Sequence, residues 1–239
     1  MPIARINARL LHFVHVPKTG GSSVKEYLLK KGPMALFNRT PLPWARTTPQ
    51  HIEGATHRIL IPEGFCDAAF MVVRDPVERL ISEFRYRTEA AVGDGRYRVD
   101  LGNGSRFTGT FDGWAHTVLD MVADDAWACD NHMRPQSDFW RTEVQVFVFE
   151  AGLGRVFDWI DQVTDTPPGA RFHENKGTRV QIEMSGDVRA RAEAFYARDL
   201  EFIAKARSGA FDLPLPAFAA PKARQRSLKG VPARDHEVS

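Results

Sequence analysis

The sequence predicts an α/β fold: a parallel β-sheet flanked by α-helices in a single domain. Three short apolar runs, at 10–16, 68–73 and 143–149, are each followed by a turn and then by apolar residues at helical spacing. Strands that alternate with helices are typical of parallel sheets, because each connection must cross back over the sheet. Ligands of such sheets bind beyond the carboxyl ends of the strands, so we look for a site in these turns.

The first unit lies near the N-terminus. Residues 10–16 are apolar and β-branched, which is typical of a buried strand. The turn Lys-Thr-Gly-Gly-Ser-Ser follows, and we expect Ser22 or Ser23 to cap the next helix. Gly32 ends that helix, and three prolines make the stretch 37–50 a loop.

The second unit repeats the same order of elements. The apolar run 68–73 stops at an Arg-Asp-Pro turn. Val77, Leu80, Ile81 and Phe84 then fall at the spacing of one helix face. We therefore expect a second strand, turn and helix.

The rest of the chain continues the alternation. Glycines and polar residues at 93–113 predict a long loop on the substrate side, and 111–122 is helical in pattern. A third strand at 143–149 leads into a helix at 153–163. Apolar spacing predicts one long helix over 187–206.

Size and composition set broad limits on domains and partners. A chain of 239 residues is long enough for one large domain, which we place at 1–213. Residues 214–239 are Pro- and Ala-rich and then basic, with too few apolar side chains to offset the entropy lost on ordering. The net charge of +2 is too small for wholesale binding of nucleic acid.

Location is inferred from the cysteines and from the apolar runs. Cys66 and Cys129 lack metal-binding spacing, and whether they pair stays open. Residues 10–16 are too short for a signal or transmembrane segment. We expect a cytoplasmic protein, with peripheral membrane association and oligomeric state left open.

The turn after the first strand has the features of a phosphate-binding loop. Gly20 and Gly21 let the backbone approach an anion, and the following helix directs N–H groups and its positive dipole end toward it. Lys18 stands before these glycines, whereas the nucleotide-hydrolysing loop has its lysine after them. The sequence therefore predicts a P-loop-like site for an anionic nucleotide, and not a site that binds ATP in the usual way.

The chain carries two specific motifs in order. They are His-Val-Pro-Lys-Thr-Gly-Gly-Ser-Ser at 15–23 and Val-Arg-Asp-Pro-Val-Glu-Arg-Leu-Ile-Ser at 73–82. They closely resemble the 5′-phosphosulfate loop and the 3′-phosphate motif of the sulfotransferases that use 3′-phosphoadenosine 5′-phosphosulfate (PAPS). More narrowly, they resemble the carbohydrate and heparan-sulfate O-sulfotransferases. Weaker matches lie at 130–136 and 195–200, and the likeness spans roughly residues 10–205.

The resemblance implies PAPS as sulfuryl donor, 3′,5′-ADP as product, and no metal. It implies that the donor's 5′ end binds to Pro17, Lys18, Thr19, Gly20, Gly21, Ser22 and Ser23. Lys18 would stabilise the negative charge that grows on the leaving phosphate. Arg74 and Ser82 would bind the 3′-phosphate, and Asn175 and Lys176 would close over the nucleotide.

A base must take the acceptor's proton, and histidine suits this task near neutral pH. His51 is our candidate, because the resembling families have a histidine taken as catalytic at this place. His57, expected on the same helix, is the second candidate for the base. If His51 is the base, we expect His57 to contact the acceptor. His132, Arg134 and Gln136 are expected to shape the acceptor pocket. The resemblance points to a hydroxyl on a carbohydrate or glycolipid as acceptor.

Two other interpretations stay open. A P-loop kinase or NTPase would need an acidic residue after another strand, and Asp75 stands there, but Lys18 lies on the wrong side of the glycines. A catalytically inactive relative would bind the nucleotide without transferring the sulfuryl group.

Overall fold

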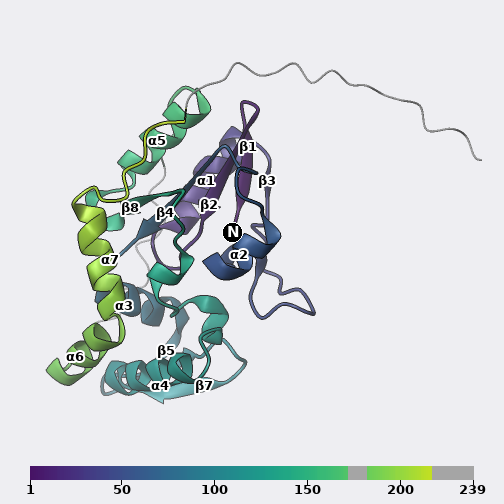
Figure 1. Ribbon diagram of the computed structural model, residues 1–239. Coiled ribbons are helices and arrows are strands. Elements are labelled where there is room, and N and C mark those ends of the chain that lie inside the picture. Colours follow the sequence, from purple (N-terminus) through teal and green to yellow (C-terminus); the bar gives the residue numbers. More distant parts are fainter. Residues whose placement is uncertain (172–181, 217–239) are drawn as a thin grey trace, which may run out of the picture.

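A five-stranded mixed sheet forms the upper part of the molecule (Figure 1). The computed structural model describes residues 1–171 and 182–216. The strands lie in the order β3 (Met34–Ala35), β1 (Ile3–Ile6), β2 (Arg9–Val14), β4 (Ala68–Val73) and β8 (Val144–Val148). β2, β4 and β8 are parallel, as predicted, whereas β1 pairs antiparallel with both of its neighbours, β2 and β3. The prediction of a wholly parallel sheet is therefore wrong at one edge.

A tight turn explains the antiparallel edge. β1 and β2 are joined by Asn7 and Ala8, whose φ angles of 45° and 62° are both positive. Two-residue hairpin turns of this kind match the twist of the flanking strands, so the chain folds straight back. The Asn7 side chain also donates to the carbonyl oxygen of Thr164, at 3.0 Å.

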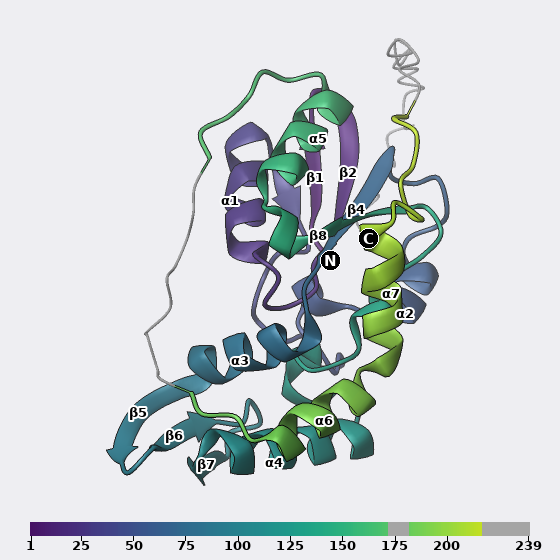
Figure 2. The ribbon, with the colours of Figure 1, turned by 90° about the vertical axis from the view of Figure 1, so that its left-hand side faces the viewer.

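Helices cover both faces of this sheet. α1 (Gly21–Lys31) and α5 (Gly154–Thr164) lie on one face, and α7 (Ala197–Arg207) lies on the other (Figure 2). Along β4, Phe70 and Val72 pack toward the first face, while Met71 and Val73 pack toward the second. Burial on both faces explains why β4 is an uninterrupted apolar run in the sequence.

A second core lies in the lower part of the molecule (Figure 2). α3 (Pro76–Arg87) and α4 (Phe111–Asp124) pack there against the antiparallel sheet of β5 (Thr88–Gly93), β6 (Arg96–Asp100) and β7 (Arg106–Gly109), and α6 (Gly186–Phe195) packs on α3 and α4. The prediction of one long loop at 93–113 is wrong, because ten of these 21 residues lie in strands and 111–113 begin α4. The Asp94-Gly95 turn between β5 and β6 is a hairpin signal in the sequence.

The predicted long helix over 187–206 is broken at Tyr196, so that prediction is wrong. Tyr196 leaves helical geometry, and its buried hydroxyl donates to the carbonyl oxygen of Met133, at 2.7 Å. The break lets α6 pack on the lower core while α7 packs on the sheet.

Four short 3₁₀ helices and one short α-helix complete the described elements. They are η1 (Pro49–His51), α2 (Gly54–Leu60), η2 (Ala128–Asn131), η3 (Gln136–Phe139) and η4 (Phe149–Ala151). His51 and His57 thus lie on different elements, not on one helix as expected. Cys66 and Cys129 are free thiols. Within the described residues, no helix is long and apolar enough to cross a membrane.

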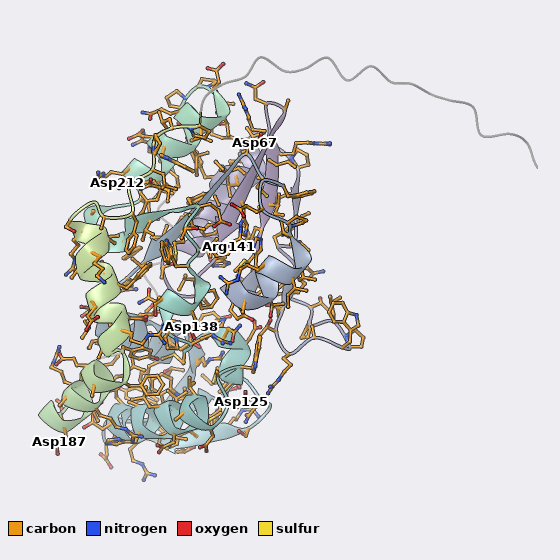
Figure 3. The ribbon with its side chains drawn as sticks, in the orientation of Figure 1. Asp67, Asp125, Asp138, Arg141, Asp187 and Asp212 are labelled. Atoms are coloured by element: carbon orange, nitrogen blue, oxygen red, sulfur yellow. The ribbon has the colours of Figure 1, made fainter. Side chains whose placement is uncertain are left out.

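Two buried histidines stack between β2 and α2. The rings of His12 and His57 lie 4.1 Å apart and nearly parallel, at 9°. Arg141, labelled in Figure 3, donates a hydrogen bond to Nδ1 of His57. Burial, with the positive charge of Arg141, lowers the pKa of His57 to about 4. Burial also lowers the pKa of His12 well below its ordinary value. The native protein therefore holds both rings neutral.

This pair predicts a loss of stability in acid. The unfolded chain takes up a proton on His57 near pH 6.5, but the native protein does so only near pH 4. The free energy of unfolding should therefore be largest above pH 6.5 and fall as the pH drops toward 4, by on the order of 2 kcal/mol for this group. Urea unfolding at pH 7 and pH 5 measures the loss, and His57→Gln should reduce it. An equal loss in that variant would show that other groups cause it.

Candidate active site

The loop between β2 and α1 depends on its two glycines for different reasons. Gly20 has a φ of 86°, in the left-handed region that favours glycine, and it precedes the first residue of α1. At Gly21 a Cβ atom would lie 1.8 Å from Nε2 of His15. Ser22 and Ser23 are the second and third residues of α1, so the prediction that one of them caps the helix is wrong. The first N–H groups of a helix have no acceptor within it, so this turn offers donors to a ligand.

The side chains before the glycines hold the loop and present a cation. The hydroxyl of Thr19 is buried and donates to the carbonyl oxygen of Val16, at 2.9 Å. The ammonium of Lys18 lies 3.9 Å from the centre of the Tyr86 ring. Partial burial lowers the pKa of Lys18, while Glu83 acts in the opposite direction.

Arg74 lies against the same loop. Its Nη1 donates to the carbonyl oxygen of Lys18, at 3.4 Å, and its guanidinium is 4.8 Å from the centre of the Phe149 ring. Arg74 also pairs with Glu78, one turn along α3, at 3.6 Å. β2 and β4 are parallel neighbours, so the residues that follow them meet at one edge of the sheet.

The side chain of Gln136 holds the backbone of Arg74 through two hydrogen bonds. Its fully buried side chain accepts from the Arg74 N–H at 2.9 Å and donates to the Arg74 carbonyl at 2.7 Å. The backbone N–H of Gln136 in turn donates to the buried carboxylate of Asp199, at 2.7 Å. The segments 130–136 and 195–200, two weak signals in the sequence, thus support Arg74 together.

Arg79 is buried between two loops. On α3, it is 1% exposed, and its Nε donates to the carbonyl oxygen of Pro17 at 3.1 Å. Its Nη2 donates to the carbonyl oxygen of His132. Arg79 therefore joins the loop that carries Lys18 to the segment that carries His132, a role that the sequence did not reveal.

His51 is paired with a carboxylate. Its Nδ1 lies 2.7 Å from Oδ2 of Asp130, which also accepts from the Thr48 hydroxyl at 2.8 Å. An ionised carboxylate only accepts hydrogen bonds, so Nδ1 of His51 carries the proton and Nε2 keeps its lone pair. Burial lowers the pKa of His51 to about 4, although its hydrogen bond to Asp130 acts against this. His51 is therefore a neutral imidazole near pH 7.

A strained turn holds Asp130 in place. Cys129, Asp130 and Asn131 have φ angles of 57°, 57° and 60°, in the left-handed region. Three such residues in a row are costly without glycine and need support from neighbouring contacts. The side chain of Asn131 supplies one, because it donates to the carbonyl oxygen of His51 at 2.9 Å.

His132 forms a second pair with a buried carboxylate. Its Nδ1 lies 2.8 Å from Oε2 of Glu83, which also pairs with Arg87. Burial alone would raise the pKa of Glu83, but His132 and Arg87 hold it well below its usual range. The His132 ring lies 4.7 Å from the His51 ring and stacks on Tyr86 at 5.8 Å. Tyr86 and His132 therefore link Lys18 to His51.

The remaining predicted site residues lie on α3, beside Trp127, against His12, or outside the described residues. Ser82 is half-buried on α3, eight residues after Arg74. Arg134 pairs with Asp138 at 3.1 Å and lies 4.7 Å from the Trp127 ring. His57 packs on His12, as described above. Asn175 and Lys176 lie outside the described residues.

Two further features bear on ligands. Side chains of His51, Asp130 and His132 offer donor atoms within 4.8 Å of one another, a set that suits a divalent transition metal. In each of these histidines, Nδ1 is already hydrogen-bonded to a carboxylate. That the reaction needs no metal stays a prediction.

A separate cavity of about 600 Å³ lies between β8, α5 and α7, and none of the predicted site residues lines it.

The chain was compared with known proteins. The model of the sulfotransferase family matches residues 7–151, more than half of the chain. The chain belongs to this family. Comparison with curated proteins and with solved structures gave no significant match.

Membership defines the general chemistry. The protein is a sulfotransferase, an enzyme that transfers sulfuryl groups, and PAPS is the donor that the family uses. The matched segment of the sulfotransferase contains the Lys18 loop, His51, Arg74 and His132. It ends before α6 and α7, so Tyr196, between these helices, and Asp199, on α7, support the site from outside the match.

The close approach at Gly21 gives a test of the loop. Gly21→Ala should force His15 or the loop to shift, with a loss of about 1–3 kcal/mol in unfolding free energy and weaker binding of 3′,5′-ADP. Gly186→Ala is the matched control, because it begins α6 with open space around its Cβ. The control should bind the nucleotide normally and be as stable as the parent or slightly more. Normal ADP affinity in Gly21→Ala would contradict this account of the loop.

Proposed function

We propose that this sulfotransferase moves the sulfuryl group of PAPS to an acceptor hydroxyl on a carbohydrate or glycolipid. One observation carries the proposal: Arg74 reaches the carbonyl of Lys18, at 3.4 Å, from 56 positions away in the chain. The two turns that carry these cations, from separate strand–turn–helix units, are thus in contact. A donor with phosphate groups at both its 3′ and 5′ positions needs this pair, whereas ATP does not.

The donor would lie across the two turns. Its 5′-phosphosulfate would bind at the P-loop-like segment Pro17, Lys18, Thr19, Gly20, Gly21, Ser22 and Ser23, where α1 begins. Its 3′-phosphate would bind to Arg74, whose planar fork suits two phosphate oxygens, and to Ser82. Gln136 would act by positioning Arg74, since both ends of its amide contact that backbone. Asn175 and Lys176 stay proposed donor contacts.

Lys18 would stabilise the leaving group. Sulfuryl transfer resembles phosphoryl transfer in needing in-line positioning and charge stabilisation. Negative charge grows on the bridging oxygen as the S–O bond breaks, and a partly desolvated ammonium acts strongly there. Lys18 rests against Tyr86 and has only to turn from that ring toward the donor.

His51 would accept the acceptor's proton. Asp130 keeps Nδ1 protonated, so Nε2 is the atom that takes the proton as the acceptor oxygen attacks sulfur. Asp130 would then stabilise the imidazolium. His132 lies beside His51 and would orient the acceptor, with Arg134 further along the same segment.

Asp75 has a structural role that weakens the kinase interpretation. Its carboxylate accepts from the N–H groups of Val77 and Glu78, at 2.9 and 3.1 Å, and so caps α3. A carboxylate used in this way is a poor ligand for the Mg²⁺ of an NTPase. We therefore favour sulfuryl transfer over ATP chemistry.

Lys18 and Arg74 should affect different kinetic constants. Lys18→Ala should lower kcat by about 10²–10³, the scale for loss of one such donor, with a smaller change in nucleotide affinity. Arg74→Ala should chiefly weaken binding of PAPS and of 3′,5′-ADP, by about tenfold or more. Transfer from labelled PAPS and calorimetry with 3′,5′-ADP measure the two effects. Lys30→Ala, at the other end of α1, is the control and should match the parent. An unchanged ADP affinity in Arg74→Ala would overturn the proposed donor site, and nucleotide binding without any transfer would indicate an inactive relative.

The His51–Asp130 pair predicts a distinctive pH profile. kcat/KM should fall as the pH drops through about 4, where His51 becomes protonated. Asp130→Asn should reduce turnover about 10²-fold or more and move this acid limb lower, since Asp130 raises the pKa of His51. His51→Ala should remove most turnover and leave ADP binding intact. Full turnover in His51→Ala, with loss in His57→Gln, would assign the base to the second candidate.

A further inference from the structure

The loop between β3 and η1 projects from the body of the protein (Figure 1). It exposes large apolar side chains, and the most exposed of them, Trp44, is 77% accessible. The others are Leu36, Phe37 and Leu42. Apolar side chains gathered on one projecting loop indicate an interaction surface, whereas scattered ones need no explanation.

The charge of this region has one sign. No Asp or Glu stands between Glu26 and Glu53 in the sequence, and the loop itself contributes Arg39 and Arg46. Arg46 pairs at 2.6 Å with Asp125, which Figure 3 shows in the lower part of the molecule. Arg39 is exposed. The loop therefore presents apolar groups beside a cation, which complements an anionic surface with an apolar interior.

The loop leads directly into the candidate base. Thr48, four residues after Trp44, is buried and donates to Asp130 through its N–H at 2.6 Å and its hydroxyl at 2.8 Å. His51 follows on η1. Whatever the loop contacts is thereby held close to the point where an acceptor hydroxyl would be deprotonated.

We propose that this loop docks on an anionic phospholipid bilayer and presents the site to a lipid-linked glycan. Trp and Phe are suited to the membrane interface, Leu to the acyl region, and Arg to lipid phosphates. Leucine offers no hydrogen bond to a sugar, so the loop fits lipid better than free glycan. Pro41 and Pro43 restrict the loop, which lowers the entropy lost on docking. The lipid-linked acceptor rests on the proposed function, but the docking itself does not.

Sedimentation with lipid vesicles tests the docking without donor or acceptor. The full chain should bind vesicles that contain phosphatidylglycerol and bind weakly to phosphatidylcholine alone, and added salt should weaken the binding. Phe37→Ser/Trp44→Ser should reduce partitioning at least about tenfold. Arg39→Glu should reduce it on the anionic vesicles. Val92→Ser, an exposed apolar residue on β5, is the control and should bind like the parent.

Several results would overturn the proposal. These are no binding to anionic vesicles, equal binding to both kinds of vesicle, and loop variants that bind like the parent. A dimer in solution that Phe37→Ser/Trp44→Ser abolishes would instead identify a second copy of the chain as the occupant. Affinity for 3′,5′-ADP, measured in Phe37→Ser/Trp44→Ser, should be unchanged. Failure of the parent to bind ADP would count against the proposed function and leave the vesicle result standing.

Discussion

The site depends on one buried arginine. Arg79 is almost wholly removed from water, and it donates to the carbonyl oxygens of Pro17 and His132, which belong to segments far apart in the chain. A guanidinium has its donors in a rigid plane, so it can join two backbones at a set distance. Lys18 follows Pro17, and the segment around His132 holds Asp130. The donor loop and the proposed base are thus placed relative to each other by a residue that need touch neither ligand.

The charged groups around this arginine are paired with one another, and burial keeps His51 neutral. Glu83 is buried as a carboxylate because His132 and Arg87 both contact it. His51 stays uncharged near neutral pH because it is buried, although Asp130 is adjacent. The neutral His51 ring, with its tautomer fixed, can accept a proton. The Lys18 ammonium, which lies over the Tyr86 ring, stays close to the donor loop. The same burial makes the stacked pair of His12 and His57 a source of acid sensitivity.

Local patterns allowed some elements to be predicted and hid others. The strand 68–73 agrees with β4, and the helices expected at 111–122 and 153–163 correspond to α4 and α5 within two residues at each end. The pattern of glycine and polar residues predicts a loop where β5 to β7 lie, although Asp94-Gly95 is a hairpin signal. The helix break at Tyr196 has no local signal, since it results from a hydroxyl bond to Met133 and from packing on two separate cores.

By itself, the sequence determined the family, the two turns and the residue types in them. Spacing along one strand–turn–helix unit is a local property, and anion binding at a glycine turn follows from it. Only the tertiary structure decided which of these residues meet. Gln136 on the backbone of Arg74, Arg79 between two loops, and Asp130 on His51 all join positions distant in the chain. No periodicity encodes such contacts, because they depend on how whole elements pack, and hydrogen bonds between buried groups then select one arrangement.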